Sequence, residues 1–415
     1  MQPVKISIQG DYIDCQIYRG RLYLWTFDGK IKVYKWDELV YSLPNSKRDA
    51  LPLKFCFLDG NYLYKSDLVE LFLDEDFKNI LIEKFSILSK QDYVISERLV
   101  DKFLYGEQDT PRNTLPTDTE IYGSMLYYIT EQGLFSSTAH RDNRKYPVST
   151  KSTKIWDCNL LAIRANKYPQ LALSGGNEGL FEFDMSTSFR RRWNLKDPVQ
   201  ISKKHSSFAN YTYWSIYNSS LTESSYMALF ELKKADDSVI TDEFDFGKSK
   251  FQREFKGEIT EERIFEGMGD RKNLSWGIDD KIYRATDNGF EIVRFRNNPN
   301  KEKGEEQFTQ LQNLDLQAWK GRVIGGGTSY YGTIVECENA LVVLLSNGES
   351  ITIEGPITRW RVYPRSMNYQ NHLHVIKDDR IEVYSFNQDY FLDQNEKLIG
   401  LEHRTPKIWH GRDTK

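Results

Sequence analysis

Short apolar strands joined by tight polar turns recur along most of this chain. The clearest copies are 23–36 around Asp28-Gly29, 171–185 around Gly175 and Gly179, 281–295 around Asp287 and Gly289, and 341–355 around Asn347-Gly348. Evenly recurring hairpins are typical of radial β repetition. The sequence therefore predicts an all-β fold, a β-propeller, and a fold of this kind does not by itself fix a function.

A second marker precedes many of the hairpins and gives a count of the repeats. It is an aromatic residue or a cysteine, found at Cys15, Phe55 or Cys56, Tyr122, Trp156, Trp214, Trp276, Trp319 and Trp360. Counting these positions predicts eight blades, with seven as the alternative. We expect the tryptophans to fill the space between neighbouring blades, where large rings bury much apolar area, and not to form a ligand site.

Length and composition agree with one large repeat domain. The chain has 415 residues, and its aromatic content of 14% favours strands over helices. We expect a single propeller over residues 1–386 and a C-terminal extension over 387–415. Residues 4–8 alternate apolar and polar side chains ahead of the first hairpin. They are predicted to join the last blade, around 357–386, and to cover its open edge.

Two segments carry a resemblance to known propeller families. Phe27-Asp28-Gly29-Lys30-Ile31-Lys32-Val33-Tyr34, followed by Trp36-Asp37, looks like the end of a WD40 repeat, and 175–184 is similar to a generic propeller hairpin. The Trp-Asp dipeptide is not repeated in register, so the chain resembles a divergent WD40-like propeller. Such a resemblance implies a binding platform more often than an enzyme.

Three stretches depart from the blade rhythm, and long departures of this kind often carry binding surfaces. In 74–118, apolar residues recur at helical spacing, which predicts one or two amphipathic helices inserted between blades. The residues in question are Phe77, Ile80, Leu81, Phe85 and Leu88, although 80–85 also fits an outer strand. Residues 233–271 and 296–312 are predicted to be long polar loops.

No sequence pattern of catalysis or cofactor binding is present, so neither an enzyme nor a cofactor is expected. His372 and His374 alternate in a predicted strand and share one face, as two metal ligands would. A metal site normally needs three or four ligands, and no third is evident near this pair. We therefore expect a pair of core or surface histidines, and no metal.

The most concentrated charge in the sequence is Arg190-Arg191-Arg192-Trp193. Its arginines can hold phosphates or an acidic protein segment, and Trp193 can stack on a base. The competing interpretation is a solvated loop whose arginines pair with acidic neighbours.

The leading functional hypothesis is an intracellular protein-binding scaffold that works as a subunit of a larger assembly. Its candidate binding residues are Phe77, Leu81 and Phe85 of the 74–118 insertion, together with the Arg190 to Trp193 loop. The alternatives are a nucleic-acid or nucleotide-binding module, and a hydrolase or lyase with an axial site. The net charge of −4 gives no overall attraction to polyanions. Four dispersed cysteines, no secretory signal and no long apolar run predict a cytoplasmic protein without a membrane partner.

Overall fold

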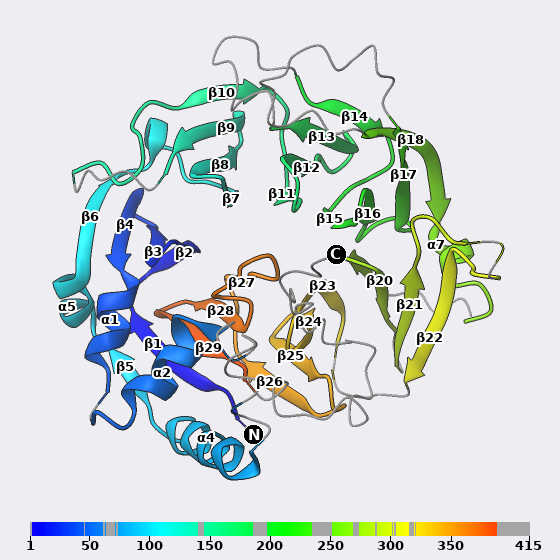
Figure 1. Ribbon diagram of the computed structural model, residues 1–415. Helices are drawn as coiled ribbons and strands as arrows, with labels where there is room; N and C mark the ends of the chain where they lie inside the picture. Colours follow the sequence, from blue (N-terminus) through cyan, green and yellow to red (C-terminus); the bar gives the residue numbers. More distant parts are fainter. Residues whose placement is uncertain are drawn as a thin grey trace, which may run out of the picture. The chain divides into compact units, whose positions relative to one another are not determined.

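The computed structural model describes residues 2–44, 46–60, 63, 71, 74–139, 145–185, 197–234, 251–268, 274–286, 289–300, 302, 304–314, 319 and 321–387. The strands in these residues form seven sheets, six of four strands and one of five (Figure 1). The fold is an all-β, seven-bladed β-propeller. The chain divides into two compact units, one of Met1–Tyr128, Phe135–Lys154 and Ala318–Lys415, the other of Ile129–Leu134 and Ile155–Gln317.

Four blades belong wholly or mostly to the first unit. Blade 1 contains β2 (Tyr12–Tyr18), β3 (Arg21–Thr26), β4 (Lys30–Lys35) and β6 (Leu104–Asp109). Blade 2 contains β7 (Asp118–Tyr122), β8 (Met125–Thr130), β9 (Gly133–Thr138) and β10 (Thr153–Trp156). Blade 6 contains β23 (Val323–Ser329), β24 (Gly332–Cys337), β25 (Ala340–Leu345) and β26 (Ser350–Glu354). Blade 7 contains β27 (Arg359–Val362), β28 (His372–Lys377), β29 (Arg380–Ser385), β1 (Val4–Gln9) and β5 (Tyr93–Ile95).

The second unit holds three blades. Blade 3 contains β11 (Ala162–Ala165), β12 (Gln170–Ser174), β13 (Leu180–Asp184) and β14 (Val199–Ser202). Blade 4 contains β15 (Phe208–Thr212), β16 (Ser215–Ser219), β17 (Tyr226–Lys234) and β18 (Phe251–Thr260), and α7 (Glu261–Ile264) follows it. Blade 5 contains β19 (Ser275–Ile278), β20 (Lys281–Ala285), β21 (Phe290–Phe295) and β22 (Phe308–Leu314).

The four predicted hairpins are confirmed as the antiparallel pairs β3–β4, β12–β13, β20–β21 and β25–β26. Their turn chemistry is local, as at Gly29, whose φ of 80° lies in the region that glycine adopts without a steric penalty. The count of eight blades is wrong by one. The marker at Phe55 or Cys56 lies on α2 (Ala50–Phe57), a helix that buries both residues.

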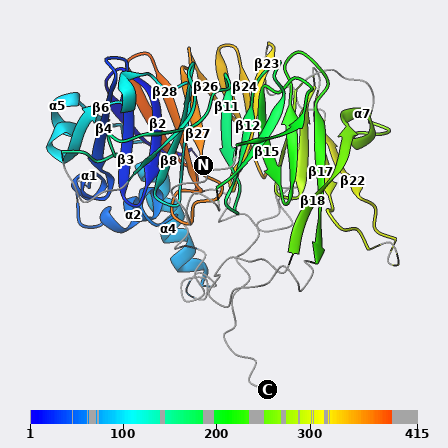
Figure 2. The same ribbon diagram turned by 90° about the horizontal axis from the view of Figure 1, so that it is seen from above.

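The described helices of the first unit, apart from η3 (Pro111–Asn113), lie in the chain between the third and fourth strands of blade 1. The chain leaves β4 into α1 (Trp36–Ser42) and α2, continues through α4 (Glu75–Leu88), β5, α5 (Glu97–Val100) and η2 (Asp101–Phe103), and returns as β6; η3 follows. Figure 2 shows α1, α2 and α4 at one end of the blade 1 strands. The stretch 74–118 is therefore not an insertion between blades, since β5 pairs with blade 7 and β6 completes blade 1.

Two stretches expected to be polar loops contain ordered elements. Within 233–271 the chain forms the end of β17, then β18 and α7, and β17 and β18 pair over nine positions from Tyr226 to Lys234. Within 296–312 the chain forms most of β22, which pairs with β21. The loop predictions are therefore wrong for β18 and for the five residues of β22 that fall in these stretches, whereas the described residues between β21 and β22 are not in strands. Outer strands carry many polar residues on their solvent side, and such a composition resembles that of a loop.

The predicted pairing of the N-terminal strand with the last blade is confirmed. β1 runs antiparallel to β29 from Val4 opposite Ser385 to Gln9 opposite Arg380. On its other side β1 pairs in parallel with β5. The last described residue is Asn387, so the predicted C-terminal extension lies outside the described residues beyond that point.

Blades 6 and 7 pack against each other where Trp360 of β27 lies over Gly327 of β23. A Cβ atom on Gly327 of β23 would lie 2.6 Å from the ring of Trp360, which belongs to β27. Trp360 packs against the buried apolar cluster that contains Ile334, Val343 and Leu373. This is the wedge role expected for a tryptophan between neighbouring blades, and Gly327 makes it sterically feasible.

Candidate functional site

A buried charge cluster joins the first strands of blades 1, 2 and 7. Arg361 of β27 donates from Nε to Asp14 Oδ1 at 2.7 Å, and from Nη2 to Asp14 Oδ2 at 2.6 Å and Asp118 Oδ1 at 2.8 Å. Thr119 donates its hydroxyl to Asp14 Oδ2 at 2.8 Å, and Gln16 Nε2 donates to the Thr119 carbonyl at 2.9 Å. All five side chains are buried, so three blades of the first unit share one satisfied polar network.

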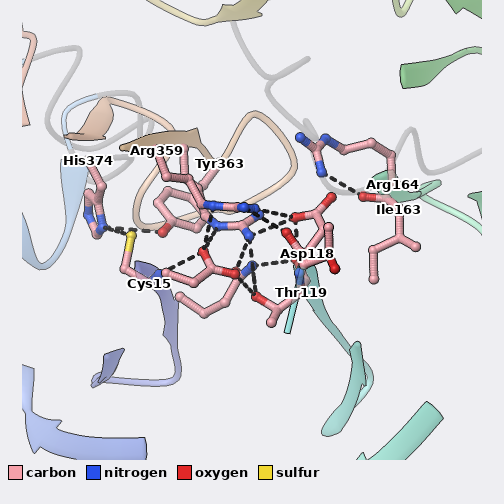
Figure 3. Close-up of polar contacts among 12 residues, drawn as sticks. Cys15, Asp118, Thr119, Ile163, Arg164, Arg359, Tyr363 and His374 are labelled. Atoms are coloured by element: carbon pink, nitrogen blue, oxygen red, sulfur yellow. Dashed lines mark hydrogen bonds and ion pairs between the residues drawn. The ribbon is translucent and has the colours of Figure 1, made fainter. Parts of the chain in front are cut away.

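The cluster is electrically balanced. Arg359 donates to Asp118 Oδ1 at 3.1 Å, and Figure 3 shows it beside Asp118 and Thr119. Arg365 pairs with Glu120 at the edge of the same group. Burial disfavours the charged guanidinium of Arg361, but the Asp14 and Asp118 carboxylates outweigh that cost and hold its pKa well above the usual range. Three arginines thus face three carboxylates, which leaves no uncompensated charge in this group to attract a ligand.

Cys15 and His374 form the one arrangement in this region that resembles a nucleophile and its base. Cys15 Sγ lies 3.8 Å from His374 Nδ1, and both appear at the left of Figure 3. Burial, followed by the nearby Asp14 carboxylate, raises the pKa of the Cys15 thiol to about 12. Burial, followed by the effects of His372 and Arg361, holds the pKa of His374 well below its usual range. A thiol that stays protonated beside an imidazole that stays neutral is not an activated nucleophile.

The two histidines belong to a chain of hydrogen bonds with a definite direction. His372 Nε2 lies 3.0 Å from the carbonyl oxygen of Cys56, and because a carbonyl only accepts, that nitrogen carries the proton. His372 Nδ1 must then accept from His374 Nε2 at 3.4 Å. His374 Nδ1 is left to accept from the Tyr363 hydroxyl at 3.2 Å. Both rings are buried, as expected for a core pair.

Metal binding was not expected from the sequence. Within the described ranges, no group of three His, Cys, Asp or Glu side chains is placed to hold a metal ion. The polar network around Arg361 instead links the first strands of blades 1, 2 and 7 by hydrogen bonds and ion pairs.

The α4 helix carries the three predicted binding residues for which the structure gives a position. Leu81 and Phe85 are 7% and 1% exposed and pack, with Leu88, in the core cluster that includes α2. They are therefore not available to a partner, because the chain's own core covers them. Phe77 is 47% exposed, and two further apolar residues of α4 are also exposed, Ile80 at 55% and Ile87 at 42%.

The other predicted binding residues, Arg190, Arg191, Arg192 and Trp193, lie outside the described residues. Sequence reasoning did not identify Asp14, Asp118 or Arg361. Arg359-Trp360-Arg361 was noted only for its tryptophan, although two arginines flanking a core residue on a strand are an unusual pattern that could have signalled a buried ionic cluster. Of the described helices, none has the length and apolar character needed to cross a membrane.

Comparison with known proteins finds similar solved structures but no related family. No family model and no curated protein matches the chain. Among solved structures it is similar to a COPII outer coat vertex on membranes, with 12% identity, a TM-score of 0.42, and 68% and 72% of the two chains covered. It is also similar to the AfRom2 CNH domain, with 14% identity, a TM-score of 0.36, and 65% and 94% covered. A third is BamB from Moraxella catarrhalis, with 10% identity, a TM-score of 0.39, and 88% and 80% covered.

Proposed function

We propose that this protein is a protein-binding scaffold subunit of a larger assembly and that α4 is its docking element. The observation that carries the proposal is the apolar surface that α4 leaves uncovered by the described residues. Phe77, Ile80 and Ile87 are all between 42% and 55% exposed, and they lie beside the face of α4 that buries Leu81, Phe85 and Leu88. Neighbouring exposed apolar side chains on one element are characteristic of binding surfaces, and helices commonly bind through such faces.

The first unit's polar cluster supports a scaffold over an enzyme. Its charges are paired within the protein, and its one cysteine–histidine contact is held in the unreactive protonation states. A binding role requires no activated nucleophile, whereas a hydrolase would require an acid, a base or a nucleophile aimed at a substrate. The structure gives no support to the nucleic-acid hypothesis, because its key residues, Arg190 to Trp193, lie outside the described part of the chain.

We keep a cytoplasmic location as part of the proposal. All four cysteines, Cys15, Cys56, Cys158 and Cys337, are free thiols, and three of them are buried. Unpaired cysteines are typical of proteins in reducing compartments.

The test is recovery of partners by the full-length chain from cells that express it naturally. The variant Ile80→Ser/Ile87→Ser should lose its stoichiometric partner yet keep the melting temperature, because both side chains are exposed. Val199→Ser is the control, because Val199 is an exposed apolar residue (63%) on β14 of blade 3 and is not part of α4. It should retain the partner. Equal recovery by wild type and the double variant, or no stoichiometric partner for wild type, would refute the role of α4.

A further inference from the structure

The exposed edge of α4 alternates acidic and apolar side chains in one line. Asp76, Ile80, Glu83 and Ile87 follow one another at spacings of four, three and four residues, and all four are exposed. Successive residues of an α-helix turn by about 100°, so these four side chains lie within an arc of about 60°. We call this line the outer seam of α4. Leu81, Phe85 and Leu88 form the buried side.

The two carboxylates of the outer seam have no counter-charge within the part of the chain that the structure describes. Among the described residues, neither Asp76 nor Glu83 forms an ion pair, although their neighbours do. Glu75 lies 3.5 Å from the ammonium of Lys78, and Lys84 lies 4.0 Å from a carboxylate oxygen of Asp49. Asp76 uses only its backbone N–H, which donates to the N-cap side chain of Asp74 at 2.9 Å. The outer seam therefore presents two negative charges and two apolar side chains in alternation.

We propose that the outer seam binds an amphipathic helix whose lysines or arginines alternate with apolar residues at the same spacing. This inference rests on the proposed function and specifies the chemistry of the partner. In such a pairing each isoleucine packs against an apolar side chain, and each carboxylate meets an ammonium or guanidinium. The spacings of four, three and four residues are the same in either chain direction. A partner helix can therefore match the charges and the apolar residues in a parallel or an antiparallel orientation. A partner helix carrying acids at those positions is repelled.

The probe is a fluorescein-labelled helical peptide with lysine and leucine alternating along one face at spacings of four and three, and alanine and glutamine elsewhere. The control peptide carries glutamate in place of each lysine. Fluorescence anisotropy with the full-length chain at about 0.05 M salt should show the lysine peptide binding at least about tenfold more tightly. At about 0.5 M salt the preference should shrink, because exposed charges are screened.

Charge reversal gives the decisive comparison. Asp76→Lys/Glu83→Lys should invert the preference, so that the glutamate peptide binds more tightly. Glu131→Lys/Glu338→Lys changes the net charge by the same amount at exposed positions in hairpin turns, and it should leave the preference for the lysine peptide unchanged. A matching inversion in the control variant would mean that overall charge, and not the outer seam, sets the preference, and would overturn the proposal.

The remaining outcomes separate this inference from the proposed function. Equal binding of the two peptides, or binding of neither, overturns the charge-alternating partner. The scaffold role then depends on the recovery experiment with Ile80→Ser/Ile87→Ser. Loss of a native partner in that variant would leave α4 as a docking element for a partner of other chemistry.

Discussion

The buried histidine pair predicts a specific loss of stability in acid. Burial lowers the pKa of His372 from 6.5 to about 3 in the folded protein. The direction of hydrogen bonding adds a reason, because a second proton on His372 would face the N–H of His374 and find no acceptor. The folded state therefore binds fewer protons than the unfolded state at any pH between these two values. Stability is fully present above about pH 6.5 and is lost as the pH falls toward about 3.

The size of the loss follows from the shift in pKa. Each pH unit below 6.5 costs about 1.4 kcal/mol until the folded-state pKa is reached. Between about pH 7 and about pH 4.5, His372 alone should remove about 3 kcal/mol from the free energy of unfolding. That is a large fraction of the total for a typical domain.

The perturbation is His372→Gln, which keeps a hydrogen-bonding side chain and removes the titration. At about pH 7 the variant should be less stable than wild type by about 1–3 kcal/mol, since it disturbs a buried network. That difference should close by about 3 kcal/mol at about pH 4.5, because only wild type contains His372 to protonate, whereas His374 is present in both proteins. Urea unfolding followed by fluorescence at a series of pH values measures both quantities.

A matched control is Tyr331→Phe, which removes a buried hydroxyl that donates to the carbonyl of His372 at 3.3 Å. Burial holds the pKa of Tyr331 well above 10, so this residue does not titrate in acid. The control should stay less stable than wild type by a constant amount across the range. If the curves for His372→Gln and wild type are also parallel from about pH 7 to about pH 4.5, the histidine argument is wrong.

Three further predictions concern the rest of the fold. Arg361→Met leaves the Asp14 and Asp118 carboxylates buried without their guanidinium and should cost about 3–5 kcal/mol by chemical denaturation. Adding Asp14→Asn and Asp118→Asn should recover much of that loss. Glu261→Gln should gain melting temperature relative to wild type as the pH rises from about 4.5 to about 8, because burial raises the pKa of the folded Glu261 and wild type loses stability on ionising it. Deleting residues 2–10 removes β1 from blade 7 and should lower stability by several kcal/mol, on the order of one buried strand. An unchanged melting temperature would show that β1 does not stabilise the sheet.

The sequence predicted features whose causes are local. Hairpins such as β3–β4 follow from an apolar run, a glycine with positive φ and a second apolar run, all within a few residues. The β1–β29 pairing was also predictable, because an alternating strand without a hairpin partner needs an edge to pair with.

Features that depend on distant residues were not predictable. The fourth strand of blade 1, β6, is separated from β4 by five helical segments of the described residues and by β5, so the eighth blade was a miscount of the helix α2. The charge cluster unites Asp14, Asp118 and Arg361, which are more than 100 residues apart in sequence, and none of them stands in a recognisable motif. On α4, helical spacing predicted an apolar face but not which part of it the core would cover.

The position of β1 also bears on how the chain is made. β1 ends at Gln9 and β29 begins at Arg380, so 370 residues lie between the two strands. At ribosomal rates of about 5–20 residues per second, β29 is synthesised about 20–70 s after β1. During that interval β5, which is synthesised far earlier, can occupy the other edge of β1. We therefore expect blade 7 to be the last sheet completed during synthesis, with its N-terminal strand held by a parallel partner until the final hairpin emerges.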